Sequence, residues 1–203
     1  MPSPLRSHVA PLILPVYLPL LALSTGMAAV VPGLPVYLRG LGASVRVVGV
    51  VLSLRGAGNL LGDVPGGVLV ARVGIRPPMR WMLALGALAN LMPALIGNLW
   101  VVAAANLLSG ISLAVAVLGM MAYVRLSTGA TFRGRALALA GGVLRVGALI
   151  GPILGGVMAD NLGMPWVFGF RTLTFVLAFL AASAGIDGRH EAAARTGARP
   201  LSE

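Results

Sequence analysis

Ionisable and polar residues interrupt stretches of the chain that are otherwise apolar. Arg55, Asn59 and Asp63 follow one another at intervals of four residues, so on a helix they form one broad polar stripe. Asp63 is the only carboxylate within any apolar stretch, and it could carry a proton or neutralise a cationic substrate. The alternative is structural, with Asp63 satisfying the backbone groups freed near Pro65. The sequence leaves both interpretations open.

Two further arginines lie inside apolar stretches. Arg145 lies about 14 Å deep by helical rise, where reaching the lipid headgroups is difficult, so we expect it to bind an anionic substrate group or a carboxylate. Arg171 lies about 9 Å inside the end of its stretch, and we expect its side chain to snorkel to the headgroups. Asn90, Asn106 and Tyr123 add hydrogen-bonding groups that are substrate or coupling candidates, although contacts between helices are their commoner role.

The rest of the composition argues against catalysis. The chain has no cysteine, and its two histidines, His8 and His190, lie near its ends. We therefore expect no metal site, no cofactor and no enzymatic activity. An intramembrane hydrolase is disfavoured because the apolar stretches hold no histidine and no Gly-x-Ser-x-Gly element.

The surroundings of these residues must be lipid. Of the 203 residues, 58% are hydrophobic and 10% are charged, whereas soluble domains carry about 25% charged residues. The net charge of +10 comes from dispersed arginines, without a single lysine, so it favours membrane orientation over nucleic-acid binding. At about 20 apolar residues per spanning helix, the chain holds about six to seven spans.

The apolar stretches predict six membrane-spanning helices in one bundle over residues 1–185, followed by a polar cytoplasmic tail over residues 186–203. The predicted spans are residues 12–36, 47–71, 79–97, 100–124, 136–159 and 165–185. Ten arginines flank the spans on the side of both termini and two flank them on the other side. Because cytoplasmic segments retain arginine, we expect a multi-pass protein of the plasma (inner) membrane with both termini cytoplasmic.

An internal repeat relates the second and fifth predicted spans. Residues 58–67 match residues 147–156, 89 residues later, and Gly74 matches Gly163. Three spans separate the copies, which predicts two inverted triplets of helices. Within each copy glycines recur every four residues and form a smooth helix face. We hypothesise that these faces meet a partner half and slide during transport, the alternative being close packing within the bundle.

The loop after the second predicted span carries a recognisable pattern. Gly67, Arg72, Gly74 and Arg76 match the loop signature of the major facilitator superfamily, and the chain resembles the amino-terminal six-helix half of that fold. In the family an Asp at the position of Ala71 helps to latch this loop to the other half.

The fifth predicted span is similar to a signature of drug/proton antiporters in that superfamily. The matching residues are Gly147, Gly151, Pro152, Gly155 and Gly156. Asn106 stands where the family often has an arginine associated with proton coupling. The resemblance implies transport of a small solute by alternating access, with drug or metabolite efflux as the type of transport that this signature suggests.

The resemblance also implies partners. Twelve spans are expected in the family and six are predicted here, so we expect a half-size unit in the lipid bilayer that needs a second half, as a homodimer or with a second six-helix chain. The alternative is a truncated or noncatalytic six-helix module that assembles with or regulates another transporter.

Overall fold

The computed structural model describes residues 12–185, so His8, His190 and the predicted tail over residues 186–203 lie outside the described residues. Every regular element within the described range is helical, which confirms the all-α class. The elements are η1 (Ile13–Tyr17, a π-helical turn), α2 (Leu18–Ala29), α3 (Leu34–Gly40), α4 (Val45–Val73), α5 (Arg76–Leu95), α6 (Leu99–Ser127), α7 (Ala130–Leu162) and α8 (Met164–Gly185).

Local signals set several helix ends. The Ser44 side chain accepts a hydrogen bond from the Val47 amide at the start of α4, and Asn98 accepts one from the Trp100 amide at the start of α6. Helices α4 and α7 both end at a glycine with positive φ, Gly74 at +100° and Gly163 at +89°. Residues 58–74 and 147–163 therefore end in the same way.

The first predicted span is broken in the structure. Helix α2 ends at Ala29 and α3 begins at Leu34, with an angle of 43° between the two segments. Pro32 and Gly33 lie in the break, where proline removes a backbone donor and disfavours helix in the preceding residue.

By length and hydropathy, four described helices can cross a membrane, namely α4, α6, α7 and α8, and the bent pair would make a fifth. Helix α5 is not among them, because Arg76, Arg80 and Asn90 and three prolines lower its apolar character. The count of six spans is thus not confirmed, while the coarser expectation of a multi-pass helical membrane protein is supported.

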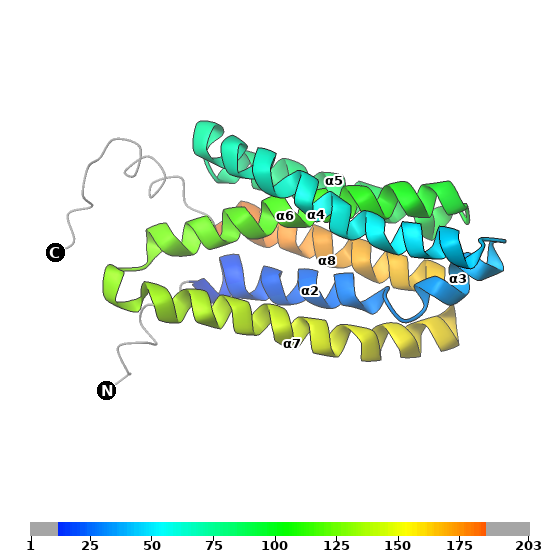
Figure 1. Ribbon diagram of the computed structural model, residues 1–203. Coiled ribbons are helices and arrows are strands. Elements are labelled where there is room, and N and C mark those ends of the chain that lie inside the picture. Colours follow the sequence, from blue (N-terminus) through cyan, green and yellow to red (C-terminus); the bar gives the residue numbers. More distant parts are fainter. Residues whose placement is uncertain (1–11, 186–203) are drawn as a thin grey trace.

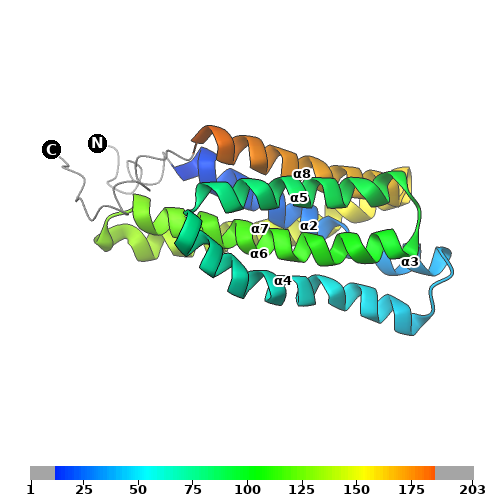
Figure 2. The same ribbon diagram turned by 90° about the horizontal axis from the view of Figure 1, so that it is seen from above.

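The long helices pack as a row that folds back on itself (Figures 1 and 2). Helix α4 packs on α6, α6 on α5, α5 on α8, α8 on α2, and α2 on α7. Helices α4 and α7 are the two ends of this row. In their most apolar windows 22% and 17% of the residues are buried, against 56% in α6, so the end helices leave most of their apolar surface uncovered.

The matched glycines lie inside this bundle. Those that recur every four residues are buried, namely Gly58, Gly62 and Gly66 on α4 and Gly147, Gly151 and Gly155 on α7. A Cβ atom on the three of α4 would meet α6, and one on the three of α7 would meet α2. At Gly58 it would collide with the Leu107 carbonyl, and at Gly155 with the Ala29 carbonyl. The hypothesis that these two faces meet a partner half is therefore wrong: they let helices of the same chain approach closely.

Candidate functional site

Two close helix contacts bring the arginines of α4 and α8 to the interior. A Cβ atom on Gly110 of α6 would collide with the Arg55 carbonyl, and one on Gly26 of α2 would collide with the Thr174 side chain of α8. The Thr174 hydroxyl in turn donates to the Arg171 carbonyl at 2.7 Å. These glycines let α4 lie against α6 at the level of Arg55, and α8 against α2 at the level of Arg171.

Arg171 points into the bundle, so the expectation that it snorkels to the headgroups is wrong. The residue is 1% exposed. Its Nε donates to the Met27 sulfur at 3.2 Å and its Nη1 to Asn106 Oδ1 at 3.4 Å, while its Nη2 has no partner. The reason is the helix face: Phe168 and Phe175, three and four residues away on α8, are also buried.

Arg55 reaches the same place from α4. Its Nη1 donates to the Met27 carbonyl at 3.3 Å, so both guanidinium groups contact Met27 and lie close to each other. Asn59 Oδ1 and Asn106 Nδ2 are buried and have no hydrogen-bond partner. The site therefore combines two positive charges with two buried amide groups that are free to form hydrogen bonds.

A pocket of about 420 Å³ connects these groups between the α4–α6 and α2–α8 pairs. Its lining is Met27, Val30, Val31, Leu34, Leu52, Arg55, Gly56, Asn59, Asn106 and Arg171. The acidic side chains in the described part of the chain are Asp63 and Asp160, and neither belongs to this lining. The positive charge of the pocket is thus uncompensated by residues 12–185.

The arrangement suits the binding of an anion. A guanidinium group is planar, stays charged and offers a fork of donors that matches carboxylate, phosphate or sulfate oxygens. Arg171 uses two of its donor atoms and leaves Nη2 free, and Asn106 Nδ2 is a second free donor. An oxyanion in the pocket would accept from these groups and balance the charge of Arg55.

The structure brings together three of the seven predicted substrate or coupling residues, Arg55, Asn59 and Asn106, and adds Arg171. Asp63 on α4 and Arg145 on α7 are exposed, and neither lines the pocket. Asp63 is also eight residues from Arg55, about 12 Å along the helix axis.

The two remaining candidates are buried elsewhere. Asn90 is fully buried, donates to the Gly86 carbonyl at 2.6 Å and accepts from the Ser109 hydroxyl at 3.0 Å, which joins α5 to α6. Tyr123 belongs to the main apolar core cluster. In this arrangement both stabilise contacts between helices.

The signature residues have mainly local roles. Gly74 ends α4, Arg76 Nη2 donates to the Ser183 carbonyl of α8 at 3.1 Å, and Arg72 is exposed. On α7 the signature glycines other than Gly156 pack against α2, and Pro152 lies inside the helix. A Cβ atom on Gly67 or Gly156 would meet no atom within 4 Å.

Replacing Ser109 by alanine should lower the free energy of unfolding by about 1–3 kcal/mol, because Asn90 Oδ1 would lose its buried donor. Thermal unfolding of the purified chain in detergent measures this loss. Ser53→Ala is the control, since Ser53 is exposed and bonds only the Gly49 carbonyl of its own helix; we expect a change within about 0.5 kcal/mol there. Equal effects of both substitutions would contradict the structural role of Asn90.

One sequence signal could have identified Arg171. It shares a helix face with Phe168, Phe175 and Ala178, at spacings of three to seven residues, and all of these are buried. Depth along the helix predicts snorkelling, but the direction of the side chain depends on which face the neighbouring helices cover.

Comparison with known proteins places the chain in a family. The family described as Major Facilitator Superfamily matches residues 17–201. The chain is also similar to the probable anion transporter 4, chloroplastic, of Arabidopsis thaliana, with 30% identity over 138 residues, which is 66% of this chain and 26% of that protein. The chain therefore matches about a quarter of the length of this curated relative. Since the family match covers most of its residues, the chain belongs to the major facilitator superfamily.

Proposed function

We propose that the chain forms part of a transporter that moves a small anionic solute across the membrane, and that the pocket between Arg55 and Arg171 binds this solute. The observation that carries the proposal is the buried guanidinium group of Arg171, which converges with Arg55 on Met27 and has no carboxylate beside it in the described pocket lining. The name of the Arabidopsis relative, an anion transporter, agrees with this substrate class.

Energetics favours a bound anion over an empty pocket. An ion buried without a partner costs several kcal/mol, and two like charges that converge add repulsion. A ligand with a carboxylate, phosphate or sulfate group would offset both terms through charge-assisted hydrogen bonds. The volume of about 420 Å³ lies at the lower end of the range for small-molecule pockets, which favours a small solute.

The packing supports a three-plus-three inverted repeat as the basis of alternating access. If the first and fourth, second and fifth, and third and sixth long segments correspond, the contact of α4 with α6 corresponds to the contact of α7 with α2. Both contacts use the matched glycines, and both α4 and α7 end at a positive-φ glycine. These correspondences are what two inverted triplets would produce.

We further propose that a second six-helix unit covers the two end helices. Asp63 on α4 and Arg145 on α7 are exposed although both lie well inside apolar helices. Ionisable groups facing lipid at such depth cost about 2.5–3.5 kcal/mol each on insertion scales, so a protein surface is the more favourable neighbour. The second unit can be a further part of a longer chain or another copy.

The antiporter-like signature of the fifth span has a structural explanation that is independent of efflux. Three of its glycines are accounted for by the packing of α7 against α2. The pocket chemistry therefore supports the substrate class, while the link between signature and efflux rests on resemblance alone.

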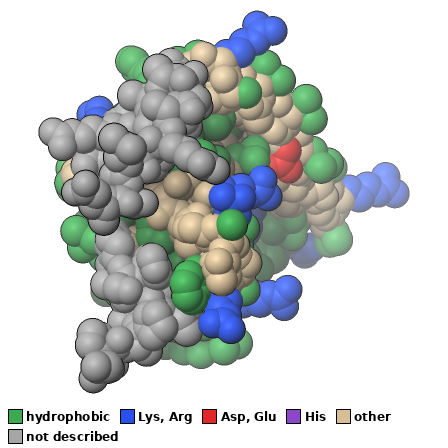
Figure 3. Space-filling model, turned by 90° about the vertical axis from the view of Figure 1, so that its left-hand side faces the viewer, with side chains coloured by type: hydrophobic (Ala, Val, Ile, Leu, Met, Phe, Trp, Pro, Cys, Tyr) green, Lys and Arg blue, Asp and Glu red, His purple; other side chains and the backbone are tan. Residues whose placement is uncertain are grey.

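The charge distribution supports an orientation. Arginine side chains gather at the end of the bundle where α4 joins α5 and α6 joins α7, seen in Figure 3. The described arginines there are Arg72, Arg76, Arg80, Arg125, Arg133 and Arg135. The opposite end carries Arg39 and Arg46 with Asp160. We propose that the arginine-rich end is cytoplasmic.

Flux in proteoliposomes tests the proposal. The reconstituted protein should accumulate labelled phosphate, sulfate or succinate in preference to the cation tetraphenylphosphonium, and Arg55→Gln should reduce anion flux at least tenfold through loss of a charge-assisted hydrogen bond. Arg39→Gln removes the same charge from an exposed site outside the pocket and should leave flux unchanged. Absence of flux for every anion would instead favour the noncatalytic membrane module.

A further inference from the structure

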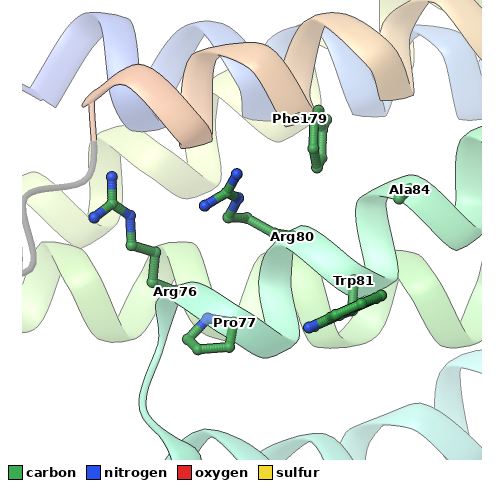
Figure 4. A pocket seen from close by; sticks show the side chains of 6 residues that line it. All are labelled: Arg76, Pro77, Arg80, Trp81, Ala84 and Phe179. Carbon is green, nitrogen blue, oxygen red and sulfur yellow. The ribbon is translucent and has the colours of Figure 1, made fainter.

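A second pocket lies on the outer side of the bundle, apart from the proposed substrate site. It measures about 440 Å³ and lies between the start of α5 and the end of α8. Figure 4 shows its lining residues, Arg76, Pro77, Arg80, Trp81, Ala84 and Phe179. We call it the α5–α8 groove. Its lining contains two arginines together with aromatic and aliphatic side chains.

Neighbouring groups hold both arginines in the groove. The Arg80 guanidinium carbon lies 5.7 Å from the centre of the Phe179 ring, a distance at which a cation is attracted to an aromatic face. Arg76 Nη2 bonds the Ser183 carbonyl, and Arg76 Nε is buried with no hydrogen-bond partner. In Figure 4 the two guanidinium groups extend to the same side, toward α8. The groove therefore presents two positive charges and one unused buried donor.

The groove faces lipid because of its place in the helix row. Helices α5 and α8 lie in the middle of the helix row, whereas α4 and α7, proposed to meet a second unit, are its ends. Trp81 is 73% exposed beside the groove, and exposed tryptophan at a helix start is typical of the membrane interface. The groove lies at the arginine-rich end of the bundle, where Figure 3 shows the basic side chains.

We propose that the α5–α8 groove binds an anionic phospholipid, with its phosphate between Arg76 and Arg80 and an acyl chain along Trp81, Ala84 and Phe179. Basic pockets between membrane helices have the chemistry that recognises such headgroups. The apolar wall distinguishes a lipid from a soluble phosphate, because only a lipid fills both parts of the groove. This inference does not depend on the substrate of the transporter.

Quenching of Trp81 by brominated lipid tests this proposal. Trp100 and Trp166 lie at the starts of α6 and α8, at the opposite end of the bundle, so the W100F/W166F variant reports from Trp81 alone. In bilayers of equal bromine content, brominated phosphatidylglycerol should quench Trp81 more strongly than brominated phosphatidylcholine. Arg80→Gln should lower this preference about tenfold, because it removes a direct charge-assisted hydrogen bond to the lipid phosphate.

Two controls separate the groove from general electrostatics. Arg133→Gln removes an exposed arginine on α7 at the same end, outside the groove, and should change the preference less than twofold. A loss as large as that of Arg80→Gln would overturn the proposal, as would an unchanged preference in Arg80→Gln. Soluble glycerol phosphate should not compete, and competition by it would show a phosphate site instead. Arg80 makes no hydrogen bond to α8 in the structure, whereas Arg76 does, so Arg80→Gln is the variant that least disturbs folding.

Discussion

Replacing Arg171 by glutamine is expected to weaken anion binding about 10- to 100-fold and, at the same time, to stabilise the empty protein. A hydrogen bond to a charged group contributes about 1.5–3 kcal/mol, which corresponds to that loss of affinity. In the absence of an anion, Arg171 is a buried charge with no carboxylate partner among the described residues. Replacing buried ionic groups by uncharged, well-packed residues is often neutral or stabilises a protein by about 1–4 kcal/mol.

Thermal unfolding in detergent, with and without phosphate, sulfate or succinate, measures both effects. The wild-type Tm should rise with anion concentration, because a ligand that binds only the folded state stabilises it. The Tm of Arg171→Gln should start higher and rise less. Arg39→Gln, at an exposed site, should behave as wild type. A lower initial Tm in Arg171→Gln would show that the arginine is a structural group and would contradict the proposed site.

Replacing Gly155 by alanine is expected to destabilise the bundle by about 1–3 kcal/mol or more. A Cβ atom at Gly155 would overlap the backbone of Ala29, its carbonyl included, so α7 would have to move away from α2. The backbone of α2 cannot adopt another rotamer to make room. Because α2 also packs against α8, which carries Arg171, anion binding should weaken together with stability.

The adjacent residue supplies the matched control. A Cβ atom on Gly156 would meet no atom within 4 Å, and alanine has the higher helix propensity, so Gly156→Ala should be neutral or slightly stabilising. Thermal unfolding of both variants, with size-exclusion chromatography for assembly, makes the comparison. If Gly155→Ala keeps its stability but loses assembly with a second unit, the assignment of this face to packing within the chain fails.

Hydropathy predicted the helices better than it predicted their arrangement. Long, predominantly apolar stretches correspond to α4, α6, α7 and α8, because burial in lipid requires a high average apolar character and tolerates a few charged residues. The break between α2 and α3 depends on Pro32 and Gly33, which the apolar composition around them obscures. Helix α5 shows the opposite difficulty, since its arginines and prolines reduce its hydropathy although it packs between α6 and α8.

The sequence predicted part of the site, because spacing and polarity identify some pocket residues but not the direction of every side chain. Arg55 and Asn59 were identified by their spacing on one helix, and Asn106 by its polarity in an apolar span. Arg171 was not, because a helix that is apolar on all sides gives little indication of which face its neighbours cover. Asp63 and Arg145 satisfy the same depth criterion and lie outside the pocket.

The glycine pattern predicted that close helix contacts form, but not which helices form them. Glycines every four residues correctly indicated a helix face for close approach. They could not indicate which helix approaches. Helix α6 is distant in sequence from α4, and α2 is distant from α7, and any smooth helix surface fits such a face. The collisions at Gly58 and Gly155 identify the partners as helices of the same chain.

Direct binding of a labelled anion tests the central claim of an anion pocket between α4 and α8. Purified protein in nanodiscs would be equilibrated with labelled phosphate, sulfate and succinate in turn, and retained anion would be counted for wild type, Arg39→Gln and the double variant Arg55→Gln/Arg171→Gln. We expect saturable binding of at least one anion to the first two proteins and its loss in the double variant. Equal binding to all three proteins, or no saturable binding to wild type, would contradict the account.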